Sequence, residues 1–411
     1  MAIDSTHSLS CCAQRQPLPP GNARRQWLRQ AGALASWTAA AALDAKPLLA
    51  GTGKDKPVAA GAPQGPFRPL AFARDAGAHT DFKTEWWYIT GWAPEAGPKA
   101  GSDAASAAAR YGFQLTFFRS RVEGTQDMQS RLAARQLLFA HAAITDVQAK
   151  RLWHAQRMAR WSGEGPGENP LDTASASSQD TGVRLQDWLL LREGADLRAR
   201  LQAEDLGMDL RFVATQPVLL QGRQGLSQKG PQAGQSSYYY SLPQLQVSGS
   251  LRLQGKTLAL NAGRAWLDHE WSEAMLPPGA QGWDWLGINL FDGSALTAFR
   301  MREPAGTAMW DGGSYRAGNA LYTFSRGEVE FRPLRHWQSP RTRARYPVEW
   351  LVRTPADFYT VRALVDDQEQ DSSQSTGTVY WEGLCELWDS NQRLVGRGYL
   401  EMTGYAAALK L

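Results

Sequence analysis

The sequence predicts an all-β protein whose strands pair antiparallel. Apolar side chains alternate with polar or small ones at a period of two, hairpin signals recur, and long amphipathic helical stretches are nearly absent. In the segment 111–118, one face of the expected strand carries Tyr111, Phe113, Leu115 and Phe117. Three hairpins are expected, at 245–260, 283–302 and 380–405. Their turns are expected at Gly255-Lys256, Asp292-Gly293 and Asp389-Ser390-Asn391, respectively.

Segments without periodicity are expected to be loops between these strands. They are rich in alanine, glycine, serine or polar residues and lie at 93–110, 163–182 and 366–377. The segment 221–237, rich in glycine, is a candidate for the mouth of a cavity. We place a domain boundary near Gly255, which gives domains at 67–255 and 256–411; the hairpin at the boundary can belong to either.

Residues 1–50 are expected to be a Tat-type export signal and leader. The pair Arg24-Arg25 precedes the uncharged, alanine-rich stretch 31–43. That stretch is too short to cross a bilayer as a helix, which takes about 20 residues. No later stretch reaches that length, so we expect a periplasmic or secreted protein with no transmembrane segment in the mature chain.

Charge and cysteine content exclude several classes of function. The net charge of +4 comes mostly from the leader, and the remaining residues are nearly neutral without a basic cluster, which argues against nucleic acid as a partner. After the leader only Cys385 remains, so the chain has no cysteine pair for a disulfide, zinc or redox motif. Histidines are scattered and no glycine-rich dinucleotide motif opens a helix, so no metal and no cofactor are expected.

The segment 266–285 concentrates the candidate chemistry. Its ionisable residues lie among tryptophans, and an apolar wall raises the pKa of a carboxyl group. The acidic and imidazole candidates are Asp268, His269, Glu270 and Asp284, and the indoles are Trp266, Trp271, Trp283 and Trp285.

Strand alternation leaves two orientations open in this segment. Asp268 and Glu270 share one face, whereas His269 and Trp271 share the other, and either face can meet a ligand. Likewise Asp284 lies opposite its two neighbouring indoles and can instead bond to a neighbouring strand. Upstream, Glu85 and Trp87 share one face, and Trp86 and Tyr88 share the other. His141, in an apolar run, is interpreted as a satisfied core histidine.

Seven motifs give the chain a resemblance to the AttH-like (carotenoid 1,2-hydratase-like) family. They follow one order from about Phe67 to the C-terminus: Glu85–Gly91, Tyr111–Arg119, Tyr238–Ser241, Asp268–Ser272, Gly282–Trp285, Tyr380–Gly383 and Gly398–Tyr405. The resemblance implies two consecutive lipocalin-like β-barrels around a hydrophobic cavity, in exported proteins often described as hydrolases. Its members include carotenoid hydratases, AttH-type components associated with ABC transporters, and fungal pericyclases.

Two functions remain open from the sequence. The first is an exported protein that binds a hydrophobic small molecule such as a lipid or isoprenoid, with ABC transporter components as possible partners. Its expected ligand-binding residues are Glu85, Trp87, Tyr239, Trp271, Trp283, Asp284 and Trp285. The second is a hydro-lyase or hydrolase acting on an unsaturated lipophilic substrate, with Asp268 or Glu270 as general acid and His269 as a positioning group. A Gly-x-Ser-x-Gly elbow is absent from the sequence, which argues against the α/β-hydrolase mechanism.

Overall fold

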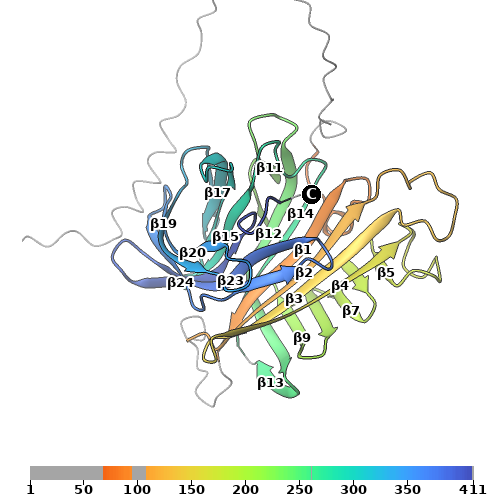
Figure 1. Ribbon diagram of the computed structural model, residues 1–411, viewed down its shortest axis with the longest axis horizontal. Helices are drawn as coiled ribbons and strands as arrows, with labels where there is room; N and C mark the ends of the chain where they lie inside the picture. Colours follow the sequence, from red (N-terminus) through yellow and green to blue (C-terminus); the bar gives the residue numbers. More distant parts are fainter. Residues whose placement is uncertain (1–67, 95–107, 261, 410–411) are drawn as a thin grey trace, which may run out of the picture. The chain divides into compact units, whose positions relative to one another are not determined.

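The computed structural model describes residues 68–94, 108–260 and 262–409, which belong to the unit Ala59–Leu411 (Figure 1). The leader and the core of the predicted 93–110 loop lie outside these residues. Every strand pairing among the described residues is antiparallel, and the only helical element is the 3-10 turn η1, Arg74–Ala76. No helix in this part of the chain has the length and apolar character needed to cross a membrane.

The first sheet takes up the chain as far as Ser272. Its described strands are β1 (Thr84–Ala93), β2 (Tyr111–Arg121), β3 (Gln136–Asp146), β4 (Arg151–Trp161), β5 (Ala174–Ala176), β6 (Gly182–Leu185), β7 (Trp188–Glu193), β8 (Asp196–Gln202), β9 (Leu206–Val213), β10 (Leu219–Leu220), β11 (Leu226–Gln228), β12 (Ser236–Leu253), β13 (Lys256–Leu260) and β14 (Arg264–Ser272). Their order is β4-β3-β2-β1-β14-β12-β9-β8-β7-β6-β5, with β10, β11 and β13 each paired to β12.

The second sheet begins at Gly282. Its described strands are β15 (Gly282–Leu290), β16 (Ala295–Arg302), β17 (Ala308–Ala317), β18 (Ala320–Phe324), β19 (Glu330–Gln338), β20 (Arg345–Arg353), β21 (Phe358–Ala363), β22 (Glu369–Ser372), β23 (Thr378–Trp388) and β24 (Leu394–Met402). Their order is β18-β17-β16-β15-β24-β23-β21-β20-β19, and β22 pairs with β23. The structure thus confirms the predicted fold class: two consecutive antiparallel sheets of the barrel type.

Three hydrophobic clusters stabilise the two sheets and the contact between them. The first fills the inside of the first sheet and includes Trp87, Phe113 and Trp271, and the second fills the second sheet and includes Trp350. The third cluster joins the two sheets, because Tyr88, Trp92 and Trp266 of the first meet Trp285, Phe299, Leu384 and Tyr399 of the second. Strand alternation makes this possible, since successive side chains of β1 and β14 point to opposite faces.

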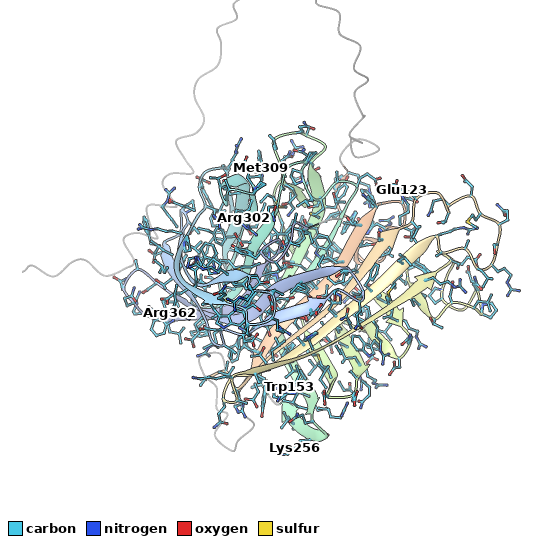
Figure 2. All side chains as sticks on the ribbon, viewed as in Figure 1. Glu123, Trp153, Lys256, Arg302, Met309 and Arg362 are labelled. Atoms are coloured by element: carbon cyan, nitrogen blue, oxygen red, sulfur yellow. The ribbon has the colours of Figure 1, made fainter. Side chains whose placement is uncertain are left out.

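The predicted hairpins are present, with one turn displaced. The β12–β13 turn falls on Gln254-Gly255, one residue before the predicted position, because Leu253 pairs with Lys256. Both turn residues have positive φ, 47° and 77°, which matches the twist of a tight hairpin. Lys256 beside this turn lies at the lower end of the coloured strands in Figure 2. The hairpins β15–β16 and β23–β24 contain the predicted turns.

Three of the predicted loops contain short strands. β5 lies in 163–182, β22 in 366–377 and β11 in 221–237. Each has at most four residues, too few for a visible alternation, and each is held by a longer neighbouring strand. The sheets change between Ser272 and Gly282, beyond Gly255, because β14 pairs with β1 and β12. The division into domains at 255/256 stays a prediction.

Candidate functional site

A cavity of about 370 Å³ lies between the two sheets. This volume falls in the range that small-molecule sites occupy. Its lining combines aromatic side chains with five acidic ones and includes Trp86, Tyr88, Phe118, Trp283, Trp285, Phe299, Glu85, Asp268, Glu270, Glu382 and Glu401. Because both sheets contribute, neither sheet alone contains the site.

The alternation of β14 directs its two acidic side chains to this cavity. Asp268 and Glu270 line it, whereas Trp271 is buried in the core of the first sheet. His269 shares the core side, where it stacks against Trp87 at 4.7 Å between ring centroids. Of the two orientations that the sequence left open, the structure therefore has the acidic pair facing the cavity.

Asp268 is held by three donors from the protein. The hydroxyls of Tyr239 and Ser241 donate to its oxygens at 2.7 and 2.5 Å, and Trp266 Nε1 donates at 2.6 Å. Burial raises the pKa of Asp268 to about 7, against the lowering effect of these hydrogen bonds. A carboxyl group with this pKa holds a proton near neutral pH and can also release it.

Glu270 is paired with a buried lysine. Lys229 Nζ lies 2.7 Å from the Glu270 carboxylate, and the Ser237 hydroxyl donates to the same oxygen. The ammonium also lies over the rings of Tyr239 and Phe299, at 4.7 and 4.3 Å from their centroids. Lys229 belongs to the 221–237 segment that the sequence predicted at a cavity mouth, and it lines this cavity.

A second pair of carboxyl groups comes from the second sheet. Glu382 of β23 and Glu401 of β24 are directly opposite each other in the ladder, so both point to the same face. Burial raises the pKa of Glu382 well above its ordinary value, and Glu401 raises it further. Burial likewise raises the pKa of Glu401 to about 7, although Trp283 Nε1 donates a hydrogen bond to it at 3.0 Å.

The indoles of β15 form part of the cavity wall. Trp283 and Trp285 line it, and Trp285 also donates a hydrogen bond to the Tyr239 hydroxyl at 3.1 Å. Asp284 lies on the opposite face of the strand, as alternation requires. Its carboxylate accepts from Arg300 at 2.7 Å and from the Tyr405 hydroxyl at 2.9 Å, so the structure does not bring it to the cavity.

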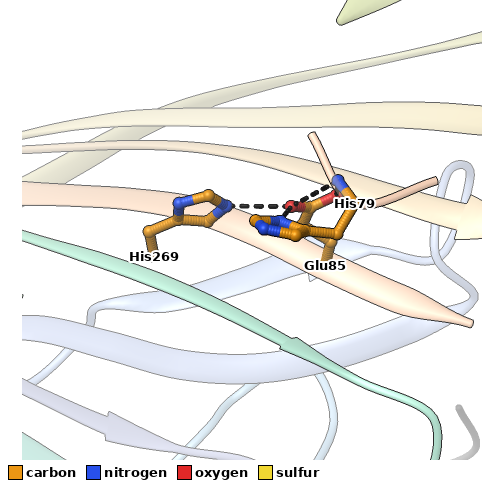
Figure 3. A group of neighbouring side chains, drawn as sticks. All are labelled: His79, Glu85 and His269. Carbon is orange, nitrogen blue, oxygen red and sulfur yellow. Dashed lines mark hydrogen bonds and ion pairs between the residues drawn. The ribbon is translucent and has the colours of Figure 1, made fainter. Parts of the chain in front are cut away.

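Glu85 lines the same cavity and forms a buried network with two histidines (Figure 3). Its oxygen Oε1 lies 2.8 Å from His79 Nδ1 and 2.9 Å from His269 Nε2, while Arg119 Nε donates to Oε2 at 2.8 Å. Burial raises the pKa of Glu85, but Arg119, His79 and His269 outweigh this effect and hold it well below its ordinary value.

The donor set of this network resembles that of a metal site, since the three ligand atoms lie within 4.8 Å of one another. The hydrogen bonds account for the cluster differently. Both imidazoles already contact one carboxylate oxygen, and the Arg119 guanidinium supplies the balancing positive charge. The His79 ring also stacks on Trp271 at 3.7 Å, so the network fixes the segment before β1 against the core. Glu85, Trp87, His269 and Trp271 are thus gathered here.

A serine and a histidine also meet at the cavity. Ser375 Oγ lies 2.9 Å from His141 Nε2, the spacing of a nucleophile and its base, and the Tyr380 hydroxyl is 2.8 Å from the other ring nitrogen. Burial, however, lowers the pKa of His141 to about 3, so the imidazole is too weak a base to activate a hydroxyl at neutral pH. His141 is thus hydrogen-bonded at both nitrogens, as expected of a satisfied histidine, but it lines the cavity and is not part of a closed core.

Among the charged residues of the cavity, sequence reasoning did not select Glu382, Glu401 or Lys229. Glu382 and Glu401 stand in two of the recognised motifs, Tyr380–Gly383 and Gly398–Tyr405, each on a strand rich in apolar residues. An acidic residue in such a strand was the available signal, and the 380–405 hairpin was predicted, but the register that places Glu382 opposite Glu401 was not. Lys229 stands in a polar loop and had no such signal.

Comparison with solved structures supports the fold over most of the chain. An AttH-type protein from Nitrosomonas europaea shares 41% identity with a TM-score of 0.73, covering 84% of this chain and 99% of the other. Kievitone hydratase from Nectria haematococca has a TM-score of 0.59 over 82% of this chain and 94% of its own, and at 15% identity it shows a common fold.

Sequence comparison points to the same family. A search of curated proteins found no significant match. The model of the family described as AttH-like matches residues 63–405, which is most of the chain. All seven motifs of the sequence analysis lie within this range, and the chain therefore belongs to the AttH-like family.

Proposed function

We propose that the cavity between the sheets binds an unsaturated lipophilic small molecule, and that Asp268 protonates it in a hydration or dehydration reaction. One observation carries this proposal: a carboxyl group that is only 3% exposed, with a pKa of about 7, faces a cavity with aromatic walls. A general acid works best when its pKa is close to the working pH.

In the proposed reaction, Asp268 gives up a proton and regains one at the end of the cycle. Asp268 gives its proton to one carbon of a C=C bond, which leaves a positive charge on the other carbon. Water then bonds to that carbon and releases a proton, which restores the acid. The faces of Trp283 and Trp285 lie in the wall, where aromatic rings stabilise a nearby cation by roughly 0.5–2 kcal/mol.

A carrier is the second candidate function. Asp268 accepts three hydrogen bonds, and Glu270 is paired with Lys229. In a carrier, these interactions have a structural role and hold the cavity wall together. In that case the chain binds a hydrophobic molecule outside the cytoplasm without converting it, possible partners being ABC transporter components. The 41% identity with the AttH-type protein is compatible with this role.

One experiment separates the enzyme from the carrier. The natively purified protein is extracted with solvent, the bound molecule is identified by mass spectrometry, and that molecule is incubated with the protein in ¹⁸O-labelled water. An enzyme changes the mass of the molecule, by adding labelled water in a hydration or by losing water in a dehydration, and Asp268→Asn lowers the rate by about 10²-fold or more while binding persists. A carrier returns the molecule with its mass unchanged, and Asp268→Asn then leaves the outcome unchanged.

Export by the Tat pathway is part of both proposals. The Arg24-Arg25 pair precedes the alanine-rich stretch at 31–43, and this pathway reads a twin arginine as its address. Replacing both arginines by lysine should retain the full-length chain in the cytoplasm, as measured by cell fractionation and immunoblotting. Normal export of the double-lysine chain would refute the Tat assignment.

A further inference from the structure

The cavity has a second polar region whose groups are not saturated by the protein. Tyr88 of β1 pairs with Asp268 across the ladder, and its hydroxyl lies near Glu382 of the second sheet. Tyr88 therefore stands between the proposed proton donor and the Glu382–Glu401 pair. The ring of Tyr88 is fixed edge-on against Trp285 at 5.3 Å between centroids, so its hydroxyl cannot swing freely away.

Two polar atoms in this region have no hydrogen-bond partner among the described residues. They are the Tyr88 hydroxyl and Glu382 Oε1, and the two do not bond each other with acceptable geometry. Tyr88 is 6% exposed and Glu382 is 1% exposed, so bulk water does not solvate them freely. A buried polar group without a partner costs about 1–3 kcal/mol, and native proteins retain few of them.

The contrast with the first polar region supports a functional interpretation. Around Asp268 the protein supplies three donors, and around Glu270 it supplies an ammonium and a hydroxyl. The chain is thus able to satisfy buried carboxyl groups in this cavity, and yet it leaves Tyr88 and Glu382 open toward the lining. Both residues line the cavity, so a ligand that enters it reaches both.

We infer that Tyr88 and Glu382 together bind one hydroxyl or carbonyl oxygen of the ligand, so that the cavity takes an oxygenated lipophile in preference to a hydrocarbon. This inference rests on the proposed function and names its ligand class. The Tyr88 hydroxyl can donate to such an oxygen, and the carboxyl oxygen of Glu382 can accept from a ligand hydroxyl. A purely apolar ligand would displace water from both groups without replacing its hydrogen bonds, which lowers affinity.

The charge around the site also limits the ligand. Glu401 lies opposite Glu382, and Glu270 lines the same cavity, so a ligand carboxylate or phosphate would meet acidic neighbours and two cations, Lys229 and Arg119. Arg119 is held by the buried carboxylate of Glu85. Lys229 is already paired with Glu270. The aromatic walls then favour a neutral molecule with one polar end.

A matched pair of probes tests this inference. Para-hexylphenol and hexylbenzene differ by one hydroxyl group, and their binding to the full-length protein is followed by isothermal titration and tryptophan fluorescence. The wild-type chain should prefer the phenol by roughly tenfold or more, the factor that about 1.4 kcal/mol of hydrogen bonding produces. Tyr88→Phe and Glu382→Met each remove one hydrogen-bonding group, so each should reduce that preference to about threefold or less while hexylbenzene binding stays within about twofold.

A matched control removes a buried hydroxyl elsewhere. Tyr346 donates to Glu369 at 2.9 Å in the second sheet and does not line the cavity, so Tyr346→Phe should keep the wild-type preference. Equal binding of both probes by the wild-type chain would overturn the inference and leave the proposed lipophile site standing. Binding of neither probe would overturn both. Loss of preference in Tyr346→Phe as well would show that the effect arises from general destabilisation, and would also overturn it.

Discussion

The chemistry of each cavity carboxyl group is set by how many donors the protein gives it. Asp268 has three donors, Glu270 has an ammonium and a hydroxyl, Glu401 has one indole, and Glu382 has none with good geometry. Burial favours the neutral form of a carboxyl group, and donors favour the ionised form. Glu382, the group without a well-placed donor, has a pKa well above its ordinary value, whereas the pKa values of Asp268 and Glu401 are raised to about 7.

The rate of the proposed reaction should report the proton on Asp268. An acid with a pKa of about 7 is protonated below that pH, so kcat/KM should be flat below about pH 7 and fall tenfold per pH unit above it. Steady-state rates with the extracted substrate between pH 5 and 9 measure this profile. A profile that instead rises with pH through 7 would show that an ionised base limits the reaction.

The same carboxyl group should make stability depend on pH. The pKa of Asp268 is raised from 3.8 to about 7, so the folded chain binds the proton more tightly than the unfolded chain. This stabilisation is fully present below about pH 4 and is lost as the pH rises through about 7. Asp268→Asn should therefore reduce the fall in the free energy of unfolding between pH 4 and 8, by on the order of 1–4 kcal/mol.

Urea unfolding at pH 4, 6 and 8 checks this expectation. Asp205→Asn, which removes an exposed carboxylate, provides the matched control and should leave the pH dependence unchanged. Because each variant is compared with the wild-type chain, the contributions of other titrating groups to the pH dependence cancel. One of these groups is Glu85, whose lowered pKa reduces the free energy of unfolding toward acid pH. An Asp268→Asn chain with the full wild-type pH dependence would contradict the raised pKa.

At the scale of elements, β14 shows how far the sequence predicts the site. Alternation alone correctly separated Asp268 and Glu270 from His269 and Trp271, because side chains on a strand point to opposite faces in turn. It did not show which face meets the cavity, since both sides of β14 are buried: one by the core of the first sheet and one by the second sheet. That distinction needs the tertiary arrangement.

Two tryptophans on different faces should respond differently to truncation. Trp271 is fully buried and stacks on His79, so Trp271→Ala should cost about 3–5 kcal/mol of unfolding free energy. Trp285 lines the cavity, so Trp285→Ala should weaken ligand binding by more than about 1 kcal/mol. Chemical unfolding and a fluorescence titration with para-hexylphenol, done on both chains, measure the two quantities. Reversed effects would place Trp271 at the ligand and Trp285 in the structural core.

At the scale of the whole molecule, the strands were easier to predict than their assembly. Long strands such as β2, Tyr111–Arg121, are predicted by the alternation of apolar and polar residues, and Asp292-Gly293 predicts the β15–β16 hairpin. The sequence predicts the β23–β24 hairpin, but not the register that brings Glu382 opposite Glu401, which depends on the loop length and on the irregularity at Leu387/Trp388. The cavity depends on such registers, which is why two of its five carboxyl groups, Glu382 and Glu401, were missed.

The polar contact between the sheets should make the described part of the chain unfold as one unit. Gln221 of the first sheet donates to Ser241 at 2.9 Å and to Thr297 at 3.3 Å, and Ser314 donates to its carbonyl oxygen at 2.8 Å. Two of these three partners, Thr297 and Ser314, belong to the second sheet. The third hydrophobic cluster reinforces this link, so we expect a single unfolding transition for both sheets.

Gln221→Leu tests how strongly the two sheets depend on this contact. The leucine leaves three buried hydroxyls without their amide partner. Each lost partner costs about 1–3 kcal/mol of unfolding free energy, and less where the hydroxyl rotates to another acceptor. We expect a lower Tm with one calorimetric transition, whereas Gln179→Leu, at an exposed position, should stay within about 0.5 kcal/mol of the wild-type chain. Two separated transitions in the wild-type chain would show that the sheets fold independently. A cavity built from both sheets would then form only after they dock, and ligand binding would raise the Tm of both transitions together.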